Sequence, residues 1–398
     1  MRTKNLFLKI FIILITLSLF FTQMTYADDI LPPDEYQTDL TFETANVSDG
    51  NMILNAKSAI SMESSTGRVL FEKNAYEKRA IASTTKIVTA IVAIEHGNLD
   101  DVVTVSANAA YTSGSVIKLK TGEKIKLLDL LYGLMLESGN DAAVAIAEKI
   151  SGSEAEYVKL MNKKAAEFGA LNTHFTTVHG LDDPDHYSTA CDMAKIMVQC
   201  MKNEMFRKIV STAETYIQGR ALRNTNDLLF TYEGTTGGKT GFTNNAGRCL
   251  VDSAKRNGME IVTVVLGCDD KKSRFLDSRK LLDYSFQKYS LKTVIEKDQV
   301  ITDIEIIKGL KTHVNLLSTD TVILPMSDEE KKNYEIDISA GDIIKAPCKK
   351  DEIIGKLYVI YNGQNIAFSN LKIAENVGSK GFWDFLKEIL YSWKEIVQ

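Results

Sequence analysis

The stretch AIASTTKIVTAIVAIEHG, residues 80–97, decides the fold of this chain. After Ser83 it is apolar on nearly every side of a helix and it ends at a glycine, which is typical of a buried central helix. Lys86 follows Ser83 by three residues and therefore lies on the same face. A serine that only capped the helix would give no reason for a lysine inside a helix built to be buried. The pair indicates a reactive site, and the dipole of the helix favours negative charge at the serine oxygen.

A second motif, Ser138-Gly139-Asn140, connects two stretches with helical patterns, residues 127–136 and 141–148. A short turn of this kind can direct a hydroxyl and an amide into a cleft. Asn140 or Asp141 could also be the N-cap of the second helix, and the two interpretations are compatible.

A third motif, Lys239-Thr240-Gly241, is predicted to lie on a strand. Asn257-Gly258 follows between two apolar runs and is a strong signal for a hairpin turn. The glycines beside the motif indicate that another backbone, such as a peptide substrate, approaches this strand closely. The same three residue types also occur at positions 120–122, where a polar turn is the simpler interpretation.

Each motif alone is weak, because Ser-x-x-Lys also occurs at Ser115, Ser285 and Ser369. Together, and in this order, the motifs supply a nucleophilic hydroxyl, an amine base, a second hydroxyl and a cation for a carboxylate. These groups are needed for acyl transfer through a covalent serine ester. Lys86 can act as the base only when it is neutral, and burial beside Lys239 favours the neutral form.

This set of motifs resembles that of the low-molecular-weight penicillin-binding proteins of the D-alanyl-D-alanine carboxypeptidase family, the S11 type of peptidase. The resemblance is strong over residues 50–290 and includes the stretches 186–194 and 224–229. In the first of these, Thr189 with Asp192 predicts a capping box, so residues 188–194 are interpreted as a helix start near the site. It implies an α/β (α+β) catalytic domain of the serine β-lactamase/transpeptidase type, with an antiparallel sheet flanked by helices. It also implies a serine carboxypeptidase that removes the terminal D-alanine from peptidoglycan stem pentapeptides, is acylated by penicillin and other β-lactams, and needs no cofactor.

The resemblance assigns the chemistry to four side chains. Ser83 attacks the carbonyl carbon between the last two D-alanines, and Lys86 accepts its proton. Ser138 passes a proton to the leaving amine, and Asn140 holds the substrate amide.

By the same resemblance a second group of residues binds the substrate: Lys239, Thr240, Gly241, Phe242 and Arg274. The lysine, the threonine and the arginine serve the terminal carboxylate, and the N–H groups of Ser83 and Phe242 form the oxyanion hole. Arg274 could instead be a solvated surface charge. The chain departs from some relatives at Thr225, where they carry an arginine, so carboxylate recognition at this corner stays open.

Two other functions share the first half of this reaction. A class A β-lactamase deacylates through a glutamate in a Glu-x-x-Leu-Asn loop, and the nearest candidate, Glu167 with Leu171-Asn172, is out of step by one residue. A non-enzymatic penicillin sensor or wall-binding protein would keep the pocket only to be acylated. The complete set of catalytic side chains favours the carboxypeptidase.

The N-terminus predicts export. Basic residues precede the apolar run Ile10 to Phe21, and Thr25-Tyr26-Ala27 offers a cleavage site. This pattern is typical of a secretory signal peptide over residues 1–27 rather than of a spanning helix. Residues 28–51 are acidic and polar, as expected of a flexible leader.

The rest of the chain is predicted to form a catalytic domain (52–290), a small all-β domain (291–375) and a C-terminal amphipathic helix (378–398). Apolar residues follow helical spacing in the last segment, which also holds both tryptophans. Such a helix is typical of a membrane interface, and packing on the protein's own core is the alternative. We therefore expect peripheral attachment to the outer face of the cytoplasmic membrane.

Composition argues against other classes of function. The chain has 398 residues, 44% hydrophobic content and a net charge of −5, which supports two domains and gives no sign of nucleic-acid binding. Its five cysteines show no disulfide-framework spacing, so free thiols are expected. Histidines and aspartates are concentrated between His174 and His186, but they lack a recognised metal-ligand spacing.

Overall fold

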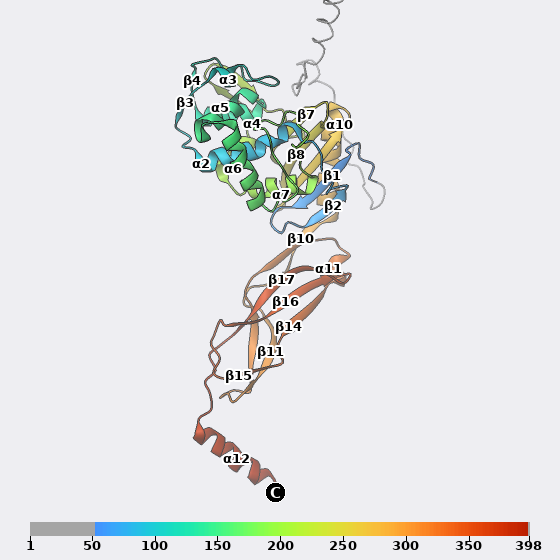
Figure 1. Cartoon of the computed structure of the whole chain (residues 1–398). Coiled ribbons are helices and arrows are strands. Elements are labelled where there is room, and N and C mark those ends of the chain that lie inside the picture. The colour runs from blue at the N-terminus through green and yellow to red at the C-terminus, as the bar shows by residue number, and fades with distance from the viewer. Residues whose placement is uncertain (1–51, 397–398) are drawn as a thin grey trace, which may run out of the picture. The chain divides into compact units, whose positions relative to one another are not determined.

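The computed structural model describes residues 52–396. The predicted signal peptide and leader, residues 1–27 and 28–51, lie outside the described residues. Where the structure is described, the chain divides into two compact units between Ser285 and Phe286. Figure 1 shows that the first unit mixes helices and strands and that the second is rich in strands. The predicted fold class, an α+β domain followed by a β domain and a terminal helix, is confirmed.

An antiparallel sheet of five strands forms the centre of the first unit, in the order β2-β1-β9-β8-β7. Its strands are β1 (Ser58–Glu63), β2 (Val69–Lys73), β7 (Thr235–Thr243), β8 (Gly247–Arg256) and β9 (Met259–Cys268). Strand β9 is buried along its whole length, because helices cover both faces of the sheet. Successive side chains of β9 point to opposite faces of the sheet. Val264 belongs to the main hydrophobic core, whereas the Thr263 hydroxyl contacts Ser278 of helix α10 (Lys271–Lys288).

Helix α2 (Lys86–His96) is the centre of a helical cluster on the other face of the sheet (Figure 1). The helices that contact it are α4 (Leu127–Leu136), α5 (Asn140–Ser151), α6 (Glu154–Glu167), α7 (Ala190–Cys200) and α8 (Glu204–Val210). Every residue of α2 from Lys86 to Ala93 is buried, as its apolar pattern predicts.

Shorter elements complete the first unit. They are the 3-10 turn η2 (Ala82–Thr85), the helices α3 (Ala107–Ala110) and α9 (Leu228–Thr231), and the pairs β3 (Val102–Thr104) with β4 (Lys124–Lys126) and β5 (Glu214–Ile217) with β6 (Arg220–Arg223). The turn η2 contacts both β7 and β8, which links the edge of the sheet to the start of α2.

The hairpin predicted at Asn257-Gly258 connects β8 to β9. Both residues have positive φ angles, 49° and 82°, which a two-residue turn of this type requires. Near the other end of these strands the register shifts, so Cys268 lies opposite Arg248 rather than Cys249. None of the five cysteines forms a disulfide, as predicted.

The second unit has a hydrophobic core of its own, which includes Leu316, Leu357 and Leu371. One sheet has the order β14-β16-β17-β12-β11-β15, and β10 pairs with β13 separately. The strands are β10 (Ser290–Ile295), β11 (Val300–Ile307), β12 (His313–Ser318), β13 (Val322–Met326), β14 (Glu335–Ala340), β15 (Ile343–Lys345), β16 (Ile353–Tyr361) and β17 (Gln364–Ile373). The short helix α11 (Glu330–Asn333) precedes β14.

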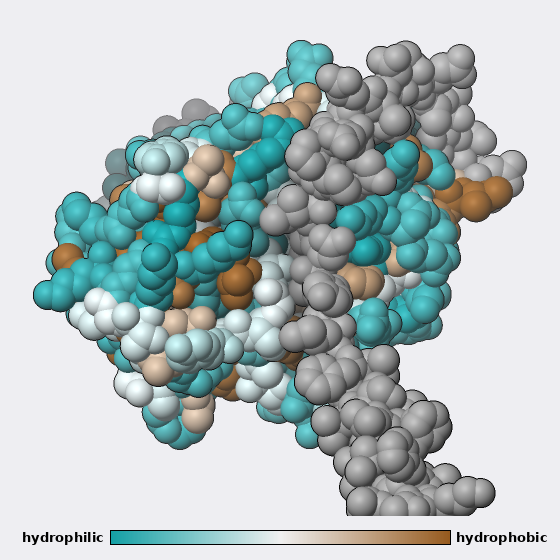
Figure 2. Space-filling view, turned by 90° about the horizontal axis from the view of Figure 1, so that it is seen from above, coloured by the Kyte–Doolittle hydropathy of each residue, from teal (hydrophilic) through white to brown (hydrophobic). Residues whose placement is uncertain are grey.

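Helix α12 (Phe382–Ile396) carries exposed apolar side chains along its length. These are Phe382, Trp383, Phe385, Leu386, Ile389, Leu390 and Trp393. On the face drawn in Figure 2, by contrast, hydrophobic residues form small separate patches among hydrophilic ones, as on most protein surfaces. Among residues 52–396, no helix has both the length and the apolar character needed to cross a membrane.

Candidate active site

Ser83 lies in the 3-10 turn η2, not in the first turn of the α-helix that the sequence predicts, because α2 begins only at Lys86. The preceding residue, Ala82, has a φ angle of 47°, in the left-handed region that side chains other than glycine rarely adopt. The hydroxyl of Thr85 donates to the Ala82 carbonyl oxygen at 2.7 Å and holds this backbone in place. Ser83 therefore lies just before the N-terminal end of α2 and not within the α-helix.

Lys86 has no exposed surface, and its Nζ lies 2.8 Å from Ser83 Oγ. Nζ also donates to Asn140 Oδ1 at 2.7 Å and to the His179 carbonyl oxygen at 2.9 Å. A neutral amine has two protons and one lone pair. Once the two protons serve the amide and the carbonyl, the lone pair faces the serine hydroxyl at a distance suited to proton transfer.

The second motif completes the same pocket. Asn140 is the first residue of α5, and its Nδ2 donates to the Ser113 carbonyl oxygen at 2.7 Å. Gly139 is the N-cap, so the alternative that Asn140 or Asp141 caps this helix is wrong. Ser138 has a φ angle of 60° and is fully buried.

Within the described residues Ser138 Oγ has no hydrogen-bond partner. A buried hydroxyl without a partner is unfavourable, and such groups are concentrated at functional sites. The geometry therefore leaves this hydroxyl available to a substrate group.

Strand β7 brings the third motif against the nucleophile. A Cβ atom added to Gly241 would lie 3.0 Å from the backbone nitrogen of Ser83 and 3.0 Å from the Ile81 carbonyl oxygen. Glycine thus allows the strand to approach η2 this closely. Phe242 follows directly on the strand, so its N–H and that of Ser83 belong to adjacent segments.

Lys239 and Thr240 are both buried on β7. Lys239 Nζ donates to the Thr240 carbonyl oxygen at 2.9 Å. The Thr240 hydroxyl lies 2.8 Å from that of Thr225, so a threonine occupies the corner where some relatives carry arginine. The side-chain amide of the neighbouring Asn226 donates a hydrogen bond to the Asp252 carboxyl group. Burial raises the pKa of Asp252 to about 8.

Arg274 is buried in the first turn of α10, with 1% of its surface exposed. The alternative of a solvated surface charge is therefore wrong. Its Nη1 donates to the Gly241 carbonyl oxygen at 3.4 Å, a long contact that places the guanidinium behind the third motif. The arginine thus adds positive charge on the same side of the site as Lys239.

His186 supports the nucleophile's turn from a distant part of the chain. Its Nδ1 accepts from the backbone N–H of Thr176 at 3.1 Å, so the ring proton lies on Nε2. Nε2 then donates to the Thr85 hydroxyl at 2.8 Å, and Thr85 donates to Ala82. Burial lowers the pKa of His186 to about 4, which keeps the ring in this neutral form at neutral pH.

The loop before His186 also packs on the turn. A Cβ at Gly180, whose φ angle is +86°, would lie 2.0 Å from the Ala82 carbonyl oxygen. Sequence reasoning missed the role of this loop, since His186 and Thr85 are 101 residues apart. The stretch beginning at His186 was part of the family resemblance, but it was interpreted only as a helix start.

That helix start is only partly as predicted. The Thr189 hydroxyl accepts from the Asp192 N–H and caps α7. The Asp192 carboxylate, however, accepts from the Asn172 N–H and the Thr173 hydroxyl rather than from Thr189. The capping box is therefore half formed, because Asp192 ties a neighbouring loop to the helix instead.

The β-lactamase candidate Glu167 lies far from the nucleophile. Its carboxylate pairs with Lys164, which also pairs with Glu95 near the C-terminal end of α2. Lys86 starts that helix, and Glu95 lies nine positions further along it, a distance of about 13 Å. Glu167 thus cannot activate water at Ser83 in this arrangement. The described part of the chain also contains no group of three or more His, Cys, Asp or Glu side chains suited to a metal.

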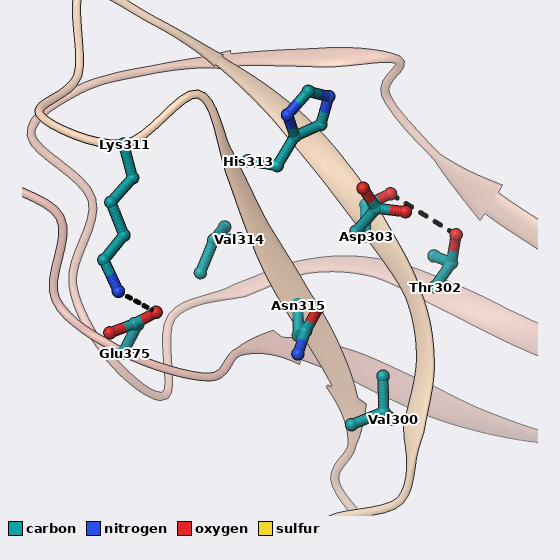
Figure 3. A pocket seen from close by; sticks show the side chains of 8 residues that line it. All are labelled: Val300, Thr302, Asp303, Lys311, His313, Val314, Asn315 and Glu375. Carbon is teal, nitrogen blue, oxygen red and sulfur yellow. Dashed lines mark hydrogen bonds and ion pairs between the residues drawn. The ribbon is translucent and has the colours of Figure 1, made fainter.

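The second unit has a depression of its own, of about 360 Å³ (Figure 3). Strands β11 and β12 contribute Asp303 and His313 to it, and Lys311 forms an ion pair with Glu375 at 2.6 Å across one side. Its lining contains no serine beside a lysine. The contact between Ser83 and Lys86, by contrast, lies in the first unit.

Comparisons with known proteins agree with this geometry. The family model D-alanyl-D-alanine carboxypeptidase matches residues 44–270, and the model for the C-terminal domain of penicillin-binding protein 5 matches residues 289–379. The chain is 37% identical to the D-alanyl-D-alanine carboxypeptidase DacF of Bacillus subtilis over 85% of this chain and 90% of that protein. It is 32% identical to DacC of Escherichia coli over 92% and 94% of the two chains. The crystal structure of penicillin-binding protein 5 from Haemophilus influenzae is similar with a TM-score of 0.74 and 31% identity, covering 84% of this chain and all of that one.

Proposed function

Because the chain belongs to the D-alanyl-D-alanine carboxypeptidase family and is a serine-type hydrolase of that family, we propose that Ser83 is its nucleophile and Lys86 the base. The observation that carries this assignment is the 2.8 Å contact between Lys86 Nζ and Ser83 Oγ in a buried pocket beside β7. The substrates are peptidoglycan stem peptides that end in two D-alanines, and β-lactams acylate the same serine.

The contacts support the following order of events. The terminal carboxylate binds near Lys239, Thr240 and the Thr225 hydroxyl, with Arg274 adding positive charge from behind. Ser83 Oγ attacks the scissile carbonyl carbon and its proton passes to Lys86. The N–H groups of Ser83 and Phe242 stabilise the oxyanion, where loss of one donor typically reduces the rate about a hundredfold or more.

Ser138 completes the first half-reaction. Its buried hydroxyl passes a proton from Lys86 to the leaving nitrogen, and D-alanine departs. Asn140 orients the amine of Lys86 and the substrate amide together. A water molecule then attacks the ester with Lys86 again as base, which regenerates Ser83.

The experiment is to measure release of D-alanine and turnover of penicillin by the same protein. We expect D-alanine release from a peptide that ends in D-Ala-D-Ala, together with a penicillin acyl-enzyme that persists for much longer than one peptide turnover. Fast penicillin hydrolysis without D-alanine release would favour a β-lactamase. Penicillin labelling with neither hydrolytic activity would favour a sensor.

We also propose that the exported protein attaches to the outer face of the cytoplasmic membrane through α12, with the β-rich region 291–375 as a spacer after the catalytic region 52–290. The exposed apolar residues of α12, including Trp383, Leu386 and Ile389, support this role, since such side chains bury their surface in a lipid interface. The charged residues of the helix are of mixed sign, so apolar burial should contribute more than lipid charge.

Deletion of residues 378–398 should move the protein from the membrane fraction to the soluble fraction. Sedimentation with liposomes gives the same information for the purified protein, and binding should persist in high salt because it depends on apolar contact. The variant Leu386→Asp should reduce binding in the full-length chain, whereas Lys387→Gln serves as the matched control. Unchanged partitioning after the deletion would contradict the anchor.

A further inference from the structure

A shallow groove of about 520 Å³ adjoins the catalytic pocket of the first unit. One wall is the segment around α3, including Asn108 and Tyr111, and the other is the loop with His179 and Leu181. Glu154, at the start of α6, also lines it. The catalytic assignment uses none of the side chains that line this groove.

In each wall of the groove, a backbone carbonyl oxygen accepts a hydrogen bond from a catalytic side chain. The Ser113 carbonyl oxygen accepts from Asn140, and the His179 carbonyl oxygen accepts from Lys86. None of the groove residues comes from β7, which carries Lys239 and Thr240. A peptide whose carboxylate binds at β7 therefore directs the residues before its scissile bond toward this groove.

The groove combines apolar walls with one acidic side chain. Leu181 and Tyr111 offer apolar surface, and Tyr111 is 84% exposed. Among the residues that line it, Glu154 is the acidic one. Asn108 Nδ2 bridges this carboxylate and that of Glu148, at 3.3 and 3.0 Å.

His179 does not neutralise Glu154. Its Nε2 lies 4.0 Å from Glu154 Oε2. Burial lowers the pKa of His179 to about 3, so the ring is neutral at neutral pH. A negative charge in a groove with apolar surface fits an aliphatic chain that ends in an ammonium group.

We propose that this groove is a subsite for the stem residue that precedes the two D-alanines, and that Glu154 selects a diamino acid side chain there. The inference rests on the proposed function, because it takes its direction from the position of the scissile bond. The Cα atom of this residue lies about 3.8 Å from that of the D-alanine that acylates Ser83. We assign the groove to its side chain because the backbones of Ser113 and His179, which line the groove, also contact Asn140 and Lys86.

The test compares two peptides, Nα-acetyl-Lys-D-Ala-D-Ala with a free ε-amine and the same peptide with the ε-amine acetylated. We expect the wild-type protein to prefer the free amine about two- to fivefold in kcat/KM, the range for a partly exposed ion pair. The ratio should fall toward one in Glu154→Gln and in high salt. Glu156→Gln, on the same helix but outside the groove, should keep the wild-type ratio.

A charge-reversal variant distinguishes selection by the Glu154 carboxylate from a merely structural effect of the substitution. Glu154→Lys should prefer a peptide with glutamate in place of the lysine, a gain that a misfolded variant cannot produce. An equal loss for both peptides in Glu154→Gln would overturn the subsite, as would an unchanged ratio. Equal hydrolysis of both peptides by the wild type would overturn the subsite and leave the carboxypeptidase intact, whereas hydrolysis of neither would overturn both.

Discussion

We expect the variant Ser83→Ala to lose covalent labelling by fluorescent penicillin and to release D-alanine at least about 10⁴-fold more slowly than the wild type. The reason is that the acyl group has no other hydroxyl to join. Ser138, the other buried serine of the pocket, has no base in contact with its oxygen within the described residues. Gel fluorescence and a D-alanine assay measure the two losses.

The controls are serines of the competing Ser-x-x-Lys matches. Ser285 lies in α10, where its hydroxyl donates to the Leu281 carbonyl oxygen and lies 3.0 Å from the Ser61 hydroxyl, and Ser115 is only partly buried. Ser285→Ala and Ser115→Ala should both label like the wild type. Persistent labelling of Ser83→Ala, in protein shown by circular dichroism to be folded, would remove the proposed nucleophile.

The sequence predicts those parts of the site that depend on local patterns. The apolar run after Ser83 predicts the buried helix α2, and Asn257-Gly258 predicts the hairpin that places β8 beside β9. The glycines of the third motif also predict that another backbone approaches this strand closely. In the structure, one such neighbour is the protein's own turn η2, which contacts Gly241.

Other parts of the site depend on contacts between residues that are far apart in the sequence, and no local sequence pattern predicts these contacts. The charge of Arg274 is equally compatible with a surface and with the buried position that it occupies behind Gly241. His186 and Thr85 meet across 101 residues. The 3-10 turn at Ser83 could not be predicted either, because the left-handed backbone of Ala82 is imposed by this tertiary environment.

The variant Lys86→Ala should reduce the rate of acylation by penicillin by about 10²- to 10⁴-fold, the usual contribution of a general base. Nζ contacts Ser83 Oγ at 2.8 Å and is therefore placed to accept its proton. The loss should appear in the acylation rate constant from stopped-flow measurements. Lys288→Ala, from a competing Ser-x-x-Lys match, is the matched control.

A second measurement separates the base from a structural lysine. Truncation at Lys86 leaves space for a small amine in a buried pocket lined by Asn140 and the His179 carbonyl. Propylamine should therefore restore part of the acylation rate, in proportion to its unprotonated fraction, whereas propanol should not, because it fills the same space without a base. Equal rescue by both molecules would show that Lys86 acts by packing. The absence of any loss in Lys86→Ala would show that the serine is activated by another group.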